Sequence, residues 1–186
     1  NVQWALIGAL AVSVYSEPRT TRDIALVVGD IEEQNHLVEK LIKKGYLEKK
    51  LLMHLAPTHR LGVRLKVRDH GDNAVPLDLL FSSSGIEPEI VKAAGRTEIL
   101  PKLFIPVAAR GHLLAMKVLS QNDVDRPRDK TDIHQLCLEA TKEDIGTAKN
   151  ALDLMTARGF NRGKDLHKEL ENVVQQYAHH LDQTFI

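Results

Sequence analysis

The chain has one cysteine, no net charge and no long apolar run, and each absence excludes a class of protein. Cys137 has no partner for an internal disulfide, which is typical of a reducing compartment. Lys plus Arg and Asp plus Glu both number 25, so any surface for a polyanion must be local. No stretch approaches the roughly 20 apolar residues of a membrane helix. We therefore expect a soluble, cytoplasmic protein with no membrane contact.

Other signals are also missing. The nine histidines show no ligand spacing for zinc, and no internal repeat or signal peptide is visible. Cys137 lies in an apolar helical pattern, where we expect a small buried hydrophobe. The chain begins with Asn1 rather than Met, so we expect its native N-terminus to lie outside it.

The hydrophobic pattern changes partway along the chain. Up to about residue 105, branched apolar runs and alternating segments predict strands between helices, and Asp30 is the expected N-cap of a helix that ends at Gly45. From Val107 the pattern is helical. We predict an α+β fold with a mixed sheet flanked by helices over 1–105 and a helical subdomain over 106–186. The expected strands are 4–7, 24–28, 46–55, 61–67, 75–81 and 98–100, and the later helices are 107–119, 130–140, 142–157 and 164–181.

Two aspartates lie beside or within apolar strand patterns. Asp23 precedes Ile24–Val28, and Asp78 is the only charge in Val75–Phe81. A carboxylate there is costly unless it is paired or binds a cation. Each alone is typical of a solvated strand end, whereas the two together favour a shared cation site downstream of Gly8. Mg²⁺ prefers such hard oxygen ligands and enters with substrate phosphates.

Basic residues supply the complementary charge. Lys117 lies in an apolar helical pattern, where a lysine either extends to solvent or reaches phosphate in a cleft. Arg126, Arg128 and Lys130 surround Asp129 and Asp132 at a helix start. That second group is also typical of a solvated helix entrance with Asp129 as its N-cap.

These segments together resemble the AbiEii/AbiGii-type nucleotidyltransferases, the toxin components of bacterial abortive-infection and toxin–antitoxin systems. The resemblance rests on segments spread over the first three-quarters of the chain in the family's order. They are Leu6-Ile7-Gly8-Ala9-Leu10-Ala11, Pro18-Arg19-Thr20-Thr21-Arg22-Asp23-Ile24-Ala25-Leu26, the strand around Asp78, the helix around Lys117, and Arg126-Pro127-Arg128-Asp129-Lys130-Thr131-Asp132.

The resemblance implies a polymerase-β-like nucleotidyltransferase fold and transfer of a nucleoside monophosphate from an NTP to an acceptor, which we expect to be tRNA or another RNA. It also implies Mg²⁺ or Mn²⁺, NTP binding between the sheet and the helical subdomain, and an antitoxin partner. Asp23 and Asp78 would be metal ligands, Lys117 would contact the triphosphate, and Asp129 would belong to the second conserved block. The expected nucleotide-binding residues are Gly8, Ala9, Arg19, Arg22 and Lys117.

The chain departs from this pattern at two positions. Ala25 stands where the family has the second metal-binding aspartate, and it offers no oxygen. Ala9 adds a methyl group where backbone amides should approach phosphate closely. Three explanations stay open: a naturally degenerate enzyme, an engineered change that silences a toxic one, or a carboxylate from elsewhere that substitutes.

Two other functions therefore compete with NMP transfer. One is a catalytically inactive binding or regulatory module with the same fold, because fold alone does not establish function. The other is DNA binding by the last helices, where Lys164, His167 and Lys168 are basic but Glu169 and Glu171 interleave with them.

Overall fold

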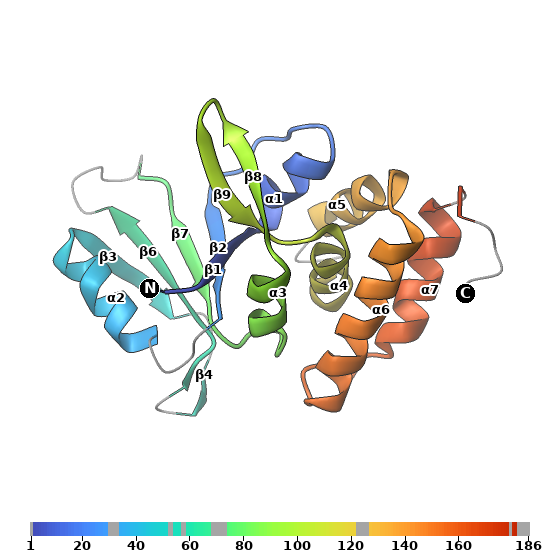
Figure 1. Ribbon diagram of the computed structural model, residues 1–186. Helices are drawn as coiled ribbons and strands as arrows, with labels where there is room; N and C mark the ends of the chain where they lie inside the picture. Colours follow the sequence, from blue (N-terminus) through green and yellow to red (C-terminus); the bar gives the residue numbers. More distant parts are fainter. Residues whose placement is uncertain are drawn as a thin grey trace. The chain divides into compact units, whose positions relative to one another are not determined.

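The computed structural model describes residues 2–29, 34–51, 54–56, 59–67, 74–121, 127–178 and 180–181. Among these residues, seven strands form one mixed sheet in the order β3-β6-β7-β2-β1-β9-β8 (Figure 1). The strands are β1 (Trp4–Ile7), β2 (Ile24–Val28), β3 (Tyr46–Leu51), β6 (Gly62–Val67), β7 (Leu77–Leu80), β8 (Gly95–Leu100) and β9 (Leu103–Val107). A separate pair consists of β4 (His54–Ala56) and β5 (His59–Arg60).

Of the helices in the described residues, three lie between strands in the sequence and four come after the last strand. They are α1 (Gly8–Tyr15), α2 (Gln34–Lys43), α3 (Glu87–Ala93), α4 (Arg110–Ser120), α5 (Pro127–Leu138), α6 (Lys142–Ala157) and α7 (Leu166–Tyr177). The predicted α+β class, a mixed sheet with helices followed by a helical region, is confirmed.

The chain divides into two compact units. The sheet unit consists of Asn1–Leu10, Arg19–Ser83 and Glu87–Ala108. The helical unit consists of Ala11–Pro18, Ser84–Ile86 and Ala109–Ile186. None of the helices in the described part of the chain is long and apolar enough to cross a membrane.

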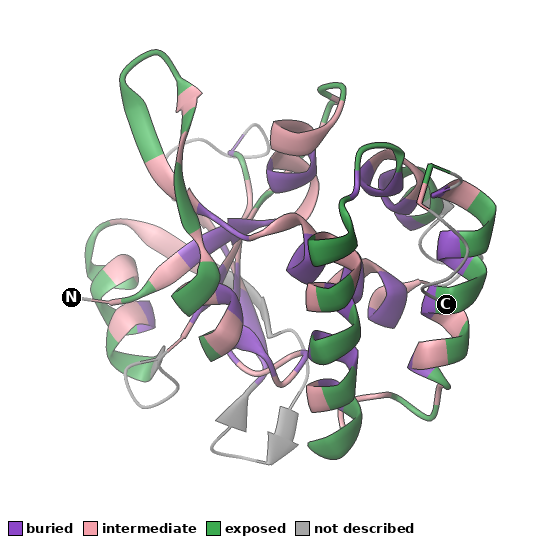
Figure 2. Ribbon diagram, turned by 45° about the vertical axis from the view of Figure 1, so that its right-hand side comes forward, coloured by how far each residue is buried: buried purple, intermediate pink, exposed green. Residues whose placement is uncertain are grey.

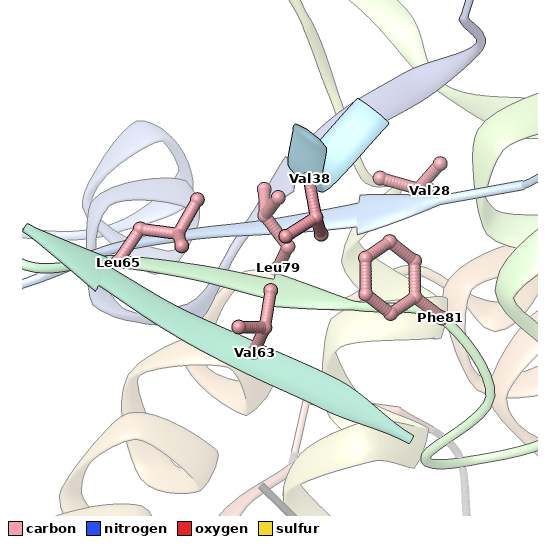
Figure 3. Packing of buried hydrophobic residues seen from close by; sticks show 6 residues of the cluster. All are labelled: Val28, Val38, Val63, Leu65, Leu79 and Phe81. Carbon is pink, nitrogen blue, oxygen red and sulfur yellow. The ribbon is translucent and has the colours of Figure 1, made fainter. Parts of the chain in front are cut away.

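The sheet unit has an apolar core on one face of its strands. Alternate residues of β6, β7 and β2 point to this face, where Val38 of α2 joins them (Figure 3). The buried residues of this cluster are Val28, Val38, Val63, Leu65, Leu79 and Phe81. Because side chains alternate along a strand, the residues between them, such as Arg64 and Asp78, project from the opposite face.

The expected last strand at Glu98–Leu100 is part of a longer hairpin. β8 begins at Gly95, and β9, which was not predicted, pairs with β8 antiparallel and with β1 in parallel. The local hydrophobic pattern of the sequence does not predict β9, because this strand is stabilised by pairing with β1, which lies far away in the sequence. Figure 2 colours most of this hairpin green, for exposed residues. Its large hydrophobic residues Leu100, Leu103 and Phe104 are exposed.

Several predicted helix boundaries also needed correction. The helix expected from Val107 begins at Arg110, since Val107 completes β9. The last helix spans Leu166–Tyr177, and the Asp165 carboxylate accepts a hydrogen bond from the Lys168 amide at its start. The predicted N-cap Asp30 lies outside the described residues.

Gly111 explains how two helices of the helical unit approach each other. A Cβ atom at Gly111 would lie 2.4 Å from the Asp144 carbonyl oxygen and 2.7 Å from Thr147 Cβ. Both atoms belong to α6, so only glycine allows α4 this close. The sequence alone gave no role for this glycine.

Candidate functional site

Asp23 and Asp78 lie near each other because β2 and β7 pair in parallel. Ala25 pairs with Asp78, and the Ile24 amide donates to the Pro76 carbonyl oxygen at 2.9 Å. Asp23 and Ala25 are two residues apart along extended chain, so both share the face that Asp78 occupies. This face is opposite the apolar core. The pairing thus brings together two carboxylates that are far apart in the sequence.

Arg64 of β6 contacts both carboxylates. β6 pairs with β7 so that Arg64 lies opposite Asp78. Its Nε donates to Asp78 Oδ1 at 2.6 Å and its Nη2 to Asp78 Oδ2 at 2.5 Å. The same Nη2 also lies 3.2 Å from Asp23 Oδ2. Hydrogen bonding to the Asp78 carboxylate, which accepts from the guanidinium, is the main cause that raises the pKa of Arg64 above its ordinary value, so the guanidinium stays charged.

The Oδ1 atom of Asp23, which Arg64 does not contact, accepts a hydrogen bond from another residue. The Thr21 hydroxyl donates to Asp23 Oδ1 at 2.9 Å. All four carboxylate oxygens of Asp23 and Asp78 therefore accept hydrogen bonds from Arg64 or Thr21. The side chain of Asp78 is 13% exposed and that of Asp23 is 40% exposed, so the cluster borders solvent.

Gly8 lies against position 25. It follows β1 directly, opens α1 and has a φ of +69°, which side-chain-bearing residues rarely adopt. A Cβ atom at Gly8 would lie 3.1 Å from the Ala25 Cβ. β1 and β2 are antiparallel, with Ile7 paired to Ala25. The turn and the methyl group are thus in close contact.

The other predicted nucleotide-binding residues in the sheet unit lie near these elements in the chain. Ala9 is the second residue of α1. Arg19 is half-buried, and its Nη1 donates to the Thr20 carbonyl oxygen at 3.3 Å. Arg22 is exposed directly before Asp23.

Lys117 lies in a second charged cluster, which belongs to the helical unit. Its Nζ lies 2.7 Å from Asp129 Oδ1 and 2.6 Å from Asp132 Oδ2. The Ser120 hydroxyl donates to Asp129 Oδ2 at 2.8 Å. Asp129 and Asp132 are 5% and 1% exposed, so the interpretation of a solvated helix entrance is wrong. The N-cap interpretation is also wrong, because α5 begins at Pro127 and contains Asp129 in its first turn.

The basic residues around this cluster have different surroundings. Arg128 and Lys130 are exposed on α5, whereas Arg126 lies outside the described residues.

Of the residues considered for DNA binding, Lys164 donates to the Leu119 and Gln121 carbonyl oxygens. His167 lies 2.5 Å from Asp153. Lys164, which precedes α7, and His167 within α7 are therefore engaged by other parts of the helical unit and are less available to a polyanion.

The carboxylates in the sheet unit do not fit a divalent metal as they stand. Three carboxylates are the usual set for two metal ions, and position 25 supplies a methyl group instead. Arg64 already contacts both remaining carboxylates. Across the described ranges, no group of three or more His, Cys, Asp and Glu side chains is placed to hold a metal ion.

No family model and no curated protein matches the chain. Several solved structures are similar to it. An antigenic nucleotidyltransferase-like protein from Paracoccidioides brasiliensis is 19% identical, with 95% of this chain and 81% of that chain covered and a TM-score of 0.46. A putative nucleotidyltransferase from H. pylori is 15% identical, with coverages of 96% and 87% and a TM-score of 0.48.

The nucleotidyltransferase toxin MenT4 from Mycobacterium tuberculosis H37Rv is a third similar structure. It is 12% identical, with 94% of this chain and 85% of that chain covered and a TM-score of 0.39. These are distant similarities, with TM-scores below 0.5. The chemistry of this chain must therefore be argued from its own side chains.

Sequence reasoning missed Arg64 and Ser120. Arg64 is one of the basic residues that alternate with apolar ones in the predicted strand over 61–67. A charge inside that strand and Asp78 inside the next strand pattern were a signal for a cross-strand ion pair. The pattern does not show which strands are neighbours, so the pair could not be assigned. Ser120 gave no signal.

Proposed function

We propose that this chain is a nucleotidyltransferase-type protein that binds a nucleoside triphosphate at the Gly8 turn beside Asp23 and Asp78. The reaction class is transfer of a nucleoside monophosphate from an NTP to an acceptor. The observation that carries the proposal is the meeting of Asp23 and Asp78 on one face of paired strands, next to a helix that opens at Gly8. Backbone amides at such a helix start are suited to phosphate.

The chain's own residues would act on the substrate in limited ways. The amides at the start of α1 would bind phosphate oxygens, and Arg19 and Arg22 precede Asp23 with further positive charge. Asp23 and Asp78 would face the reacting group. Two carboxylates and one guanidinium leave a net charge of −1, which gives little stabilisation to the negative charge that develops during phosphoryl transfer.

The second candidate is a catalytically inactive binding or regulatory module with the same fold. Two observations favour it. Ala25 offers no oxygen, and Arg64 already engages both carboxylates. Such a module would bind NTP without transferring its nucleotide.

The acceptor in the proposed reaction is an RNA end. Arg128 and Lys130 are exposed on α5 of a protein without net charge, and local positive charge of this kind suits a polyanion. The Arg128→Glu variant should weaken RNA binding more than NTP binding. Equal losses of both affinities would assign Arg128 to the nucleotide instead.

The finer family assignment is also part of this proposal. The AbiEii/AbiGii-type resemblance, with a toxin role, Mg²⁺ or Mn²⁺ in active relatives and an antitoxin partner, rests on the sequence segments around Gly8, Asp23, Lys117 and Asp129. Co-expression of this chain with the protein encoded next to it, followed by co-purification, would test the antitoxin partner.

Calorimetric titration with each of the four common NTPs tests the binding claim. We expect the wild-type chain to bind at least one NTP and Gly8→Ala to weaken that affinity at least tenfold. The added methyl group would crowd Ala25 and displace the helix start.

Gly45→Ala is the matched control, because Gly45 also has a positive φ, of +97°, but has open space around its Cβ position. Both variants lose about 1 kcal/mol of stability to the left-handed backbone, so a loss of affinity in Gly8→Ala alone reports on the turn at Gly8. Absence of NTP binding in both the wild type and Ala25→Asp would contradict the proposal.

A further inference from the structure

We propose that Arg64 takes the place of a divalent cation at the Asp23–Asp78 pair, so that this pair is held by a guanidinium and does not bind metal in the wild-type chain. The observation behind this proposal is a row of residues across three strands. Arg64 of β6 pairs with Asp78 of β7, and Asp78 pairs with Ala25 of β2. The central carboxylate thus has a guanidinium on one side and a methyl group on the other.

The hydrogen-bond geometry matches a dedicated ion pair. The planar guanidinium presents Nε and Nη2 to the two oxygens of Asp78, the bidentate arrangement that arginine makes with a carboxylate and lysine cannot. Its Nη2 also reaches Asp23. A metal ion at the pair would have to displace Arg64 from three oxygens and then lie close to its positive charge.

Ala25 and Arg64 both disfavour a bound cation at this site. Ala25 removes one negative charge and one oxygen donor from the usual three-carboxylate set. Arg64 then adds a positive charge that the remaining two carboxylates share. No third carboxylate from the described residues replaces the missing ligand, since no group of three metal-ligating side chains is present among them. Arg64 thus accounts for how two adjacent carboxylates are stable without a metal.

Electrostatics support the same conclusion. An arginine side chain is charged at ordinary pH, so Arg64 presents a cation to both carboxylates. The Asp78 side chain is 13% exposed, which limits solvent screening of its bond to Arg64. Divalent cations should therefore compete poorly for this pair.

Titration with Mn²⁺, followed by the loss of the electron paramagnetic resonance signal of the free ion, tests the proposal. We expect no stoichiometric binding by the wild type at millimolar Mn²⁺. In the Ala25→Asp background, Arg64→Gln should tighten Mn²⁺ binding at least tenfold, because it frees both carboxylates beside the new third one. Arg64→Lys should tighten it less, since the positive charge is kept.

Lys66→Gln is the matched control, because Lys66 lies two residues from Arg64 on the same strand and its loss removes the same charge from the chain. It should leave Mn²⁺ binding unchanged in the Ala25→Asp background. Circular dichroism and thermal melts verify that each variant is folded, and the Arg64→Lys variant keeps the test valid if Arg64→Gln does not fold. Stoichiometric Mn²⁺ binding by the wild type that is lost in Asp78→Asn would overturn the proposal. So would equal Mn²⁺ affinity of Ala25→Asp with and without Arg64. This readout requires no nucleotide, so it is independent of the proposed NTP binding.

Discussion

Arg64 and Asp78 face each other across β6 and β7 and are joined by two parallel hydrogen bonds, of 2.6 and 2.5 Å. This ion pair links β6 to β7. Because Arg64 occupies both oxygens of Asp78, it also limits the binding of a metal ion by the carboxylates. The same side chain reaches Asp23, so a single arginine holds both acidic residues on this face of the sheet.

Gly111→Ala should destabilise the protein by about 1–3 kcal/mol, the usual cost of overpacking. The added methyl group would lie 2.4 Å from the Asp144 carbonyl oxygen, and that atom is backbone and cannot rotate away. Gly146→Ala on α6 is the control, since its Cβ position is open. It should stabilise the protein by roughly 0.5–1 kcal/mol, because alanine is the better helix former. Urea denaturation of both variants measures the difference; equal effects would mean that α4 and α6 are not in close contact.

Lys117→Met should destabilise the helical unit by about 3–5 kcal/mol, because it leaves buried Asp129 and Asp132 without their cation. Lys149→Met removes an exposed lysine from α6 and should change stability by less than about 0.5 kcal/mol. Chemical denaturation of the two variants gives the comparison. A small effect at Lys117 with a large loss of NTP affinity would instead assign it to triphosphate, as the sequence resemblance implied.

Cys137 should be nearly inert in the folded protein. Burial raises the pKa of its thiol from 9.0 to about 12, so at pH 8 only about one thiol in ten thousand is ionised. Iodoacetamide should modify it slowly in buffer and rapidly in denaturant, as measured by mass spectrometry. The unfolded chain ionises this thiol above about pH 9 and the folded chain does not, so stability should fall as the pH rises from 9 toward 12. Rapid modification under native conditions would show that Cys137 is accessible.

Much of the fold was predictable because its signals are local. The strands at Trp4–Ile7 and Ile24–Val28 and the helix at Lys142–Ala157 match the predicted bounds. The buried state of Cys137 is also confirmed. β9 was missed because it forms by pairing with β1, which no local pattern reveals. Arg64 was missed for the same reason: its role depends on β6 lying beside β7, and that neighbourhood is a property of the sheet.

We infer that Asp23 and Asp78 belong to a nucleotide-transfer site whose activity Arg64 and Ala25 reduce. The most direct measurement is transfer of radiolabel from an α-labelled NTP to an RNA pool in magnesium buffer, with the wild type and the Ala25→Asp, Arg64→Gln double variant. We predict much stronger labelling by the double variant than by the wild type, lost again when Asp23→Asn is added. A double variant that is folded and binds NTP but labels no RNA, or a wild type that labels RNA equally well, would contradict the claim.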